Sequence, residues 1–119
     1  MKELALEIAA ILYEKKARNI VALDVNGMTV VTDCMLIASG RSELQVKALA
    51  DEVEDRMAEK GVRPTRREGR QEGRWAVLDY GTVLVHIFRE EERAYYRLDQ
   101  LWDAGDNRIP LPFDSETDD

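Results

Sequence analysis

At 119 residues the chain is long enough for one hydrophobic core and too short for two. Its 24 acidic and 17 basic residues give a formal net charge of −7, and Cys34 is the only cysteine, which excludes an internal disulfide. No apolar run approaches the ~20 residues of a membrane span, and the start does not resemble a signal peptide. We therefore expect a soluble, cytoplasmic protein whose core is held by packing.

The charge is unevenly placed along the chain. From Asp99 onward there are seven acidic residues against one basic residue, Arg108, whereas the preceding part is nearly neutral. A body without basic excess gains little from releasing phosphate counterions, so non-specific nucleic-acid binding is not expected. We predict a folded domain over residues 1–104 and an acidic, partly disordered tail over residues 105–119, in which Leu111 and Phe113 are candidates to dock. The tail is either a solvating end or a contact for a basic partner.

The first half of the chain predicts a helix, two strands and a second helix. Residues 2–17 place apolar side chains such as Leu4 and Ile8 on one helical stripe. Residues 19–25 and 34–38 predict strands, with a turn between them at Asn26-Gly27. Ser42, followed three residues later by Gln45, predicts the capped start of a helix that closes at Lys60-Gly61.

The segment over residues 62–74 is strongly basic, with five arginines against two glutamates. It predicts a mobile loop with a short edge strand near its start. Its arginines are either merely solvated or contact RNA phosphate or an acidic protein patch. Near the other end of the domain, residues 90–102 predict a third helix with Tyr95, Leu98, Leu101 and Trp102 on one side.

Between these segments lies the stretch that organises the chain, a predicted hairpin with strands over residues 75–79 and 83–88. Pairing Asp79 with Thr82 across the turn places Trp75 opposite His86. One face of this hairpin is wholly apolar, and the other mixes polar residues with large apolar ones, so both faces need a cover. A helix, a second copy of the chain or a foreign protein would each supply the second cover. Together the elements predict a single α/β domain, a mixed sheet of about five strands packed with helices.

Residues that often carry chemistry do not assemble into an active site in the sequence. Ser39 ends a strand just before a helix and favours capping over anion binding. Asp24 and Asp33 are not spaced as a metal-binding pair, and His86 and Cys34 stand without partners. The residues predict a binding module with no metal and no cofactor rather than an enzyme. The alternative is a nucleotidyltransferase-like phosphoryl enzyme that uses Ser39, Asp24 and Asp33.

An ordered set of short motifs resembles the Iojap-like ribosomal silencing factors. The motifs span most of residues 1–104 and are Asp33-Cys-Met-Leu-Ile-Ala-Ser-Gly-Arg-Ser42, Glu72-Gly-Arg-Trp75, Leu78-Asp-Tyr-Gly81, Val85-His-Ile-Phe88, Arg93-Ala-Tyr-Tyr-Arg-Leu98 and Leu101-Trp102. Each motif alone is short, and the specificity lies in their order. Cys34-Met35 and Thr82 depart mildly from the family, which commonly has aromatic residues and an acid there.

The resemblance implies a non-enzymatic factor with a fold similar to nucleotidyltransferases but without their metal carboxylates. It also implies a partner, ribosomal protein fourteen (uL14) on the intersubunit face of the large ribosomal subunit. A protein bound there blocks association with the small subunit and represses translation. A role in large-subunit biogenesis and a homodimer in the free state are further implications of the family.

The hairpin supplies candidate residues for that partner contact. Trp75 and Tyr80 offer rigid aromatic surface, which dominates the binding energy of many protein interfaces. Asp79 can accept hydrogen bonds from a basic side chain, and His86 lies on the same face as Trp75. We expect Leu84 and Phe88 to be the apolar surroundings of this contact, or else to serve internal packing.

Overall fold

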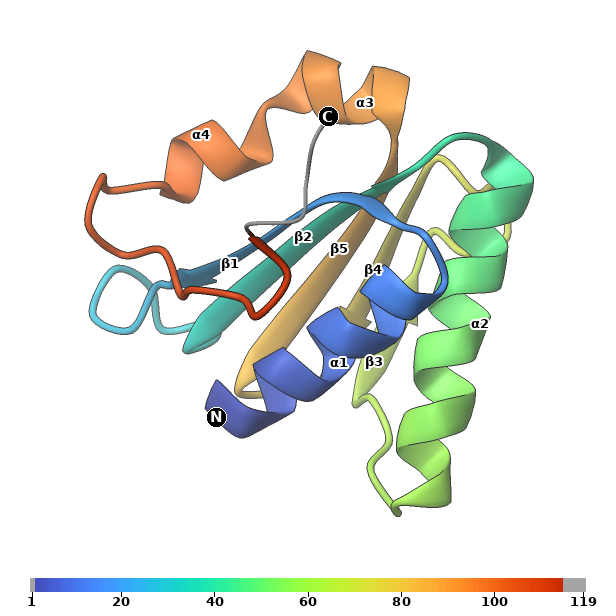
Figure 1. Cartoon of the computed structure of the whole chain (residues 1–119), viewed down its shortest axis with the longest axis horizontal. Helices are drawn as coiled ribbons and strands as arrows, with labels where there is room; N and C mark the ends of the chain where they lie inside the picture. Colours follow the sequence, from blue (N-terminus) through green and yellow to red (C-terminus); the bar gives the residue numbers. More distant parts are fainter. Residues whose placement is uncertain (1, 115–119) are drawn as a thin grey trace.

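A five-stranded mixed sheet runs through the computed structural model, which describes residues 2–114 (Figure 1). The strands lie in the order β1 (Arg18–Asp24), β2 (Cys34–Gly40), β5 (Val83–Arg89), β4 (Trp75–Asp79) and β3 (Arg66–Glu68). Strands β2 and β5 run parallel, and the other three neighbouring pairs are antiparallel. The connection between the parallel strands contains a helix, as expected of a crossover.

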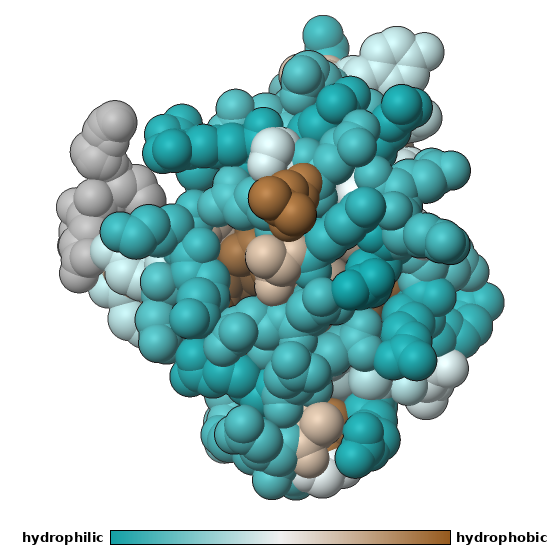
Figure 2. Space-filling model, turned by 90° about the vertical axis from the view of Figure 1, so that its right-hand side faces the viewer, coloured by the Kyte–Doolittle hydropathy of each residue, from teal (hydrophilic) through white to brown (hydrophobic). Residues whose placement is uncertain are grey.

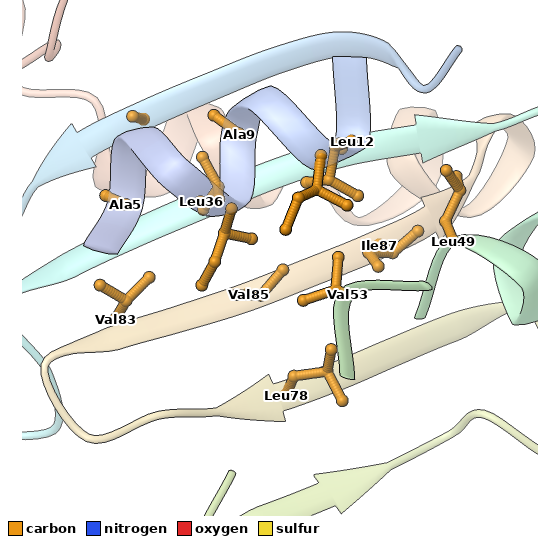
Figure 3. Close-up of a cluster of buried hydrophobic side chains, with 14 of the residues drawn as sticks. Ala5, Ala9, Leu12, Leu36, Leu49, Val53, Leu78, Val83, Val85 and Ile87 are labelled. Carbon is orange, nitrogen blue, oxygen red and sulfur yellow. The ribbon is translucent and has the colours of Figure 1, made fainter. Parts of the chain in front are cut away.

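Helices cover both faces of this sheet. Helices α1 (Lys2–Glu14) and α2 (Glu43–Glu59) cover one face, where their apolar side chains meet Val85 and Ile87 of β5 (Figure 3). Helices α3 (Glu90–Tyr96) and α4 (Leu98–Trp102) lie on the other face, over a separate apolar cluster. The predicted α/β domain with a mixed five-stranded sheet is confirmed. None of the described helices is long and apolar enough to cross a bilayer.

Helix α2 begins with the predicted cap. The Ser42 hydroxyl accepts a hydrogen bond from the Gln45 backbone N–H at 3.1 Å, and the Gln45 side-chain oxygen accepts one from the Arg41 N–H at 2.6 Å. Such a cap stabilises a helix by about 1 kcal/mol. Gly61 follows the helix with a φ of 80°, the left-handed conformation that the sequence predicts after a helix end.

The hairpin keeps its predicted faces but not its predicted register. Asp79 pairs with Leu84 and Trp75 with Phe88, a shift of two residues from the expected pairing with Thr82. The carbonyl of Thr82 accepts hydrogen bonds from the backbone N–H groups of Asp33 and Cys34, which draws Thr82 out of the hairpin and toward β2. Because side chains alternate with a period of two, the shift leaves every residue on its predicted face.

Two helix boundaries differ from the sequence prediction. Helix α1 ends at Glu14 rather than at residue 17, because Lys16 turns to a φ of 71°. The single helix expected over residues 90–102 is two helices, since Arg97 has a φ of 53° and ends α3. The break turns Leu98 and Trp102 onto the apolar cluster, whereas Leu101 remains 71% exposed. The break therefore divides the apolar side predicted for this segment.

The segment after α4 is packed on the domain as far as the structure describes it. Backbone hydrogen bonds join Asn107 to Asp24 and Ile109 to Ala22, each at 2.8 Å, so the segment lies along the outer edge of β1. Leu111 and Phe113 are buried, as expected, and Phe113 stacks on Tyr13 of α1 at 4.2 Å between ring centroids. The last part of the predicted acidic tail, residues 115–119, lies outside the described residues.

This packing predicts that Phe113 contributes strongly to stability. Replacing Phe113 with Ala removes a buried ring and leaves a cavity beside α1, so the free energy of unfolding falls by roughly 3–5 kcal/mol. Urea unfolding followed by circular dichroism measures the change. Leu44→Ala is the matched control, because Leu44 is 78% exposed and its loss changes stability little. Equal stabilities of the two variants contradict the packing role.

Candidate partner-binding surface

Three of the predicted binding residues, Leu84, His86 and Phe88, lie with Trp75 on the sheet face that carries α3 and α4. Trp75 is partly exposed and packs against the apolar cluster of that face. Its ring stacks on Phe88 with 4.7 Å between centroids and lies 4.9 Å from the ring of Tyr96 on α3. Trp75 is thus a partly buried aromatic side chain held in one orientation by its neighbours.

His86 fixes the other side of the Trp75 ring. The indole N–H of Trp75 donates a hydrogen bond to His86 Nδ1 at 3.1 Å, so the neutral imidazole carries its proton on Nε2. His86 is only 6% exposed, and Nε2 has no hydrogen-bond partner among the described residues. Burial lowers the pKa of His86 from 6.5 to about 4, so the side chain is neutral at physiological pH. His86 therefore holds Trp75 in place as a neutral acceptor.

The remaining predicted residues divide between the two faces of the sheet. Leu84 and Phe88 are buried beside Trp75, with Phe88 at 0% exposure, so they support the surface from below. Asp79 accepts a hydrogen bond from the Gly81 N–H at 2.8 Å and lies 3.8 Å from the Arg66 guanidinium. Its carboxylate thus fixes the turn as well as lying near the hairpin end.

Tyr80 packs on the opposite side of the sheet, against the cluster under α1 and α2. Its hydroxyl is buried with no hydrogen-bond partner among the described residues. Burial raises the pKa of Tyr80 to about 12, and the negative charge of Glu54 acts in the same direction. The structure therefore brings Trp75, Leu84, His86 and Phe88 together and separates Tyr80 from them.

The structure also exposes two aromatic residues next to this site that the sequence prediction did not select. Tyr96 is 51% exposed beside Trp75, and Tyr95 is 79% exposed, with its ring 5.0 Å from that of Tyr96. We predicted that Tyr95 lies on the apolar side of its helix, and this is wrong. The helical neighbour of Tyr95 one turn earlier is Glu91, a polar residue that indicates exposure of this side of the helix.

In the alternative phosphoryl-transfer site, Ser39 lies apart from the other two residues, Asp24 and Asp33. Strands β1 and β2 pair so that Arg18 is opposite Ser39 and Asp24 is opposite Cys34, which puts Ser39 and Asp24 at opposite ends of the ladder. Asp24 and Asp33 accept hydrogen bonds from the backbone and the side chain of Asn26, at 3.0 Å and 2.8 Å. Their role in the structure is to shape this turn, and no group of three or more metal-ligating side chains occurs among residues 2–114.

The basic segment is paired with helix α2. Arg67 forms an ion pair with Glu54 at 2.6 Å, and Arg70 donates two hydrogen bonds to Asp51. Arg74 lies 3.5 Å from Glu43. The expected edge strand is β3, next to β4. The side of the molecule on which α2 lies is covered mainly by hydrophilic residues (Figure 2). These arginines therefore already have acidic partners within the domain.

The buried, neutral His86 predicts a dependence of stability on pH. The unfolded chain takes up a proton near pH 6.5 but the folded protein only near pH 4, so stability is lost as the pH falls between these values. The loss is at most about 3 kcal/mol, since one pKa unit corresponds to about 1.4 kcal/mol. Urea unfolding at a series of pH values from 7 to 4.5 measures it. His86→Gln, which cannot titrate, should show a shallower slope; equal slopes contradict the assignment.

Comparisons with known proteins agree with this architecture. The family model described as "Ribosomal silencing factor during starvation" matches residues 1–119. A crystal structure of a Bacillus halodurans protein superposes with a TM-score of 0.80 at 39% identity, covering 93% of this chain and all of that one. A Chromobacterium violaceum structure gives a TM-score of 0.82 at 32% identity, covering 93% and 91%. The expected similarity to nucleotidyltransferases stays a prediction.

Sequence relatives support the same family as the family model. "Ribosomal silencing factor RsfS" of Bacillus subtilis is 44% identical over 94 residues, which cover 79% of this chain and 80% of the relative. "Protein Iojap, chloroplastic" of Zea mays is 30% identical over 112 residues, which cover 94% of this chain and 48% of that longer protein. The match to the family model and the identity to the bacterial relative both extend over most of the chain. The chain therefore belongs to the ribosomal silencing factor family.

Proposed function

We propose that the protein represses translation by binding ribosomal protein fourteen on the large ribosomal subunit and preventing the small subunit from joining. The mechanism is steric, because a standard protein interface of about 800 Å² on each partner is enough to obstruct a neighbouring surface. Such a mechanism needs a rigid binding surface and no chemistry. It is consistent with the regulatory role that the names of the relatives express.

The observation that carries this proposal is the partly exposed, firmly held Trp75. Its ring stacks on Phe88, donates a hydrogen bond to His86 and lies beside Tyr96. Little side-chain conformational freedom therefore remains to be lost on binding. Large aromatic side chains held in this way are the common anchors of protein interfaces. Asp79, at the end of the same hairpin, can accept a hydrogen bond from a basic side chain of the ribosomal protein. In this proposal Leu84, His86 and Phe88 support the anchor from below.

Tyr80 has a different part in this proposal. Its ring packs on the side of the sheet under α1 and α2, with a buried hydroxyl. A contact that involves both Trp75 and Tyr80 must therefore reach around the end of the hairpin. We assign Tyr80 to the margin of the surface and Trp75 to its centre.

We further propose that the protein acts in the cytoplasm, forms a homodimer when it is free, and takes part in large-subunit maturation. These proposals rest on the resemblance to the family. Within residues 2–114, this sheet face is covered by the two short helices α3 and α4, which is compatible with a second copy or a ribosomal partner on that side.

The proposal predicts a change in the ribosome profile. Stoichiometric addition of the protein to assembled ribosomes shifts sucrose-gradient profiles toward free subunits, and the protein sediments with the large subunit. Trp75→Ala weakens both effects by roughly 10-fold or more, the size expected for an aromatic anchor. Unchanged profiles under stoichiometric loading contradict the function.

Because Trp75 also packs on Phe88, a folding control is needed. Circular dichroism and urea unfolding of Trp75→Ala show whether its fold survives the loss of the ring. Trp75→Phe keeps an apolar ring on Phe88 but removes the indole N–H, so it retains more of the fold. Leu44→Ala, on the α2 side, serves as the surface control. A folded Trp75→Ala protein that binds large subunits like the wild type contradicts the assignment of the anchor.

A further inference from the structure

Four aromatic rings form a continuous series from the core to the surface of the sheet face that carries α3. Phe88 is fully buried, Trp75 lies over it, Tyr96 lies beside Trp75, and Tyr95 ends the series in solvent. The rings of Tyr95 and Tyr96 meet edge to face, at an interplanar angle of 89°. Such a contact leaves the exposed Tyr95 ring with a defined orientation. Tyr95 is 79% exposed and Tyr96 51%, and exposed apolar side chains that lie side by side in this way are typical of interaction surfaces.

Acidic side chains accompany this exposed ring. Helix α3 begins with three glutamates, and Glu91 lies one helical turn before Tyr95, on the same face. The side chain of Glu91 is 71% exposed. Its cationic neighbour, Arg89, lies 3.4 Å away but bonds more closely to Glu92, at 2.8 Å, and also lies 3.5 Å from Glu43. Three carboxylates thus share one guanidinium, and Glu91 is the most exposed of them.

The exposed Tyr95 ring and the neighbouring Glu91 carboxylate together fit one kind of partner group, a guanidinium. A guanidinium is planar and cationic; it stacks on aromatic rings and donates two hydrogen bonds to a carboxylate. An RNA backbone is the poorer candidate beside Tyr95, because the exposed Glu91 carboxylate repels its phosphates. A purely apolar partner would offer the Glu91 carboxylate no cation beyond the Arg89 that it shares with Glu92.

We propose that the ring of Tyr95 and the carboxylate of Glu91 form a receptor for an arginine side chain of the ribosomal protein that contacts Trp75. The inference rests on the proposed function and deepens it, since it names the chemistry of a second contact next to the aromatic anchor. The face of the Tyr95 ring stacks on the guanidinium, and the Glu91 carboxylate accepts hydrogen bonds from the guanidinium N–H groups. Tyr96 joins the two contacts by touching both Trp75 and Tyr95.

Co-sedimentation with purified large subunits at increasing protein concentration tests the receptor. Tyr95→Ala weakens binding by roughly 5- to 10-fold, whereas Tyr95→Phe, which keeps the ring, binds nearly like the wild type. Glu91→Lys places a cation against the arginine and weakens binding at least as much. The matched controls on α2 are Leu44→Ala, which removes an exposed apolar side chain, and Asp55→Lys, which makes the same charge change at another exposed site. Both controls bind like the wild type.

The outcomes separate the receptor from the function on which it rests. If the wild type sediments with large subunits, and Tyr95→Ala and Glu91→Lys both bind as tightly as the wild type, the receptor is overturned and the proposed function stands. If Glu91→Lys binds more tightly, an RNA phosphate faces α3, which also overturns the arginine receptor. If the wild type does not sediment with large subunits, the proposed function fails and the receptor fails with it. Circular dichroism of each variant verifies its fold.

Discussion

Burial of strand β5 on both faces is the constraint on which the rest of the structure depends. Its residues alternate between the cluster under α1 and α2 and the cluster under α3 and α4, and Val83 to Phe88 are all buried. A strand apolar on both sides needs a cover on each. The two covers are unequal, since α1 and α2 have 13 and 17 residues whereas α3 and α4 have seven and five. The thinner cover leaves Trp75 partly exposed.

The distribution of charge complements this unequal cover. On the α2 side, the arginines of residues 66–74 meet carboxylates of the helix in a series of ion pairs. Individual surface pairs of this kind contribute little to stability, typically about 0–1 kcal/mol. Their effect is to neutralise that side, which is mainly hydrophilic in Figure 2. On α3, by contrast, Glu91 and Glu92 share a single guanidinium, that of Arg89, and Glu91 stays largely exposed on the same helix as the exposed tyrosines. The polarity of the surface therefore favours α3 over α2 as the side that meets a partner.

The sequence predicts most of the fold because its strongest patterns are local. The cap at Ser42, the Gly61 that follows α2 and the two faces of the hairpin depend on neighbouring residues, and the structure has all of them. The hairpin register depends instead on Thr82, whose carbonyl accepts backbone hydrogen bonds from Asp33 and Cys34, about 50 positions earlier in the chain. Similarly, α3 ends at Arg97, while Arg93 one turn earlier is held by the carbonyl of Asn19. Contacts between distant segments decide these features, and no local pattern reports them.

The candidate site was predictable to the same extent. The alternation along the hairpin correctly placed Trp75 and His86 on one face, because a shift by two residues preserves faces. It could not show that His86 accepts from the indole N–H, since that contact depends on the true register. Nor could it show that α3 would bring Tyr96 to the side of Trp75. An aromatic side chain becomes an effective anchor when its neighbours fix its orientation before binding. In this protein those neighbours come from β4, β5 and α3, so the rigidity of the surface is a property of the assembled domain rather than of the hairpin alone.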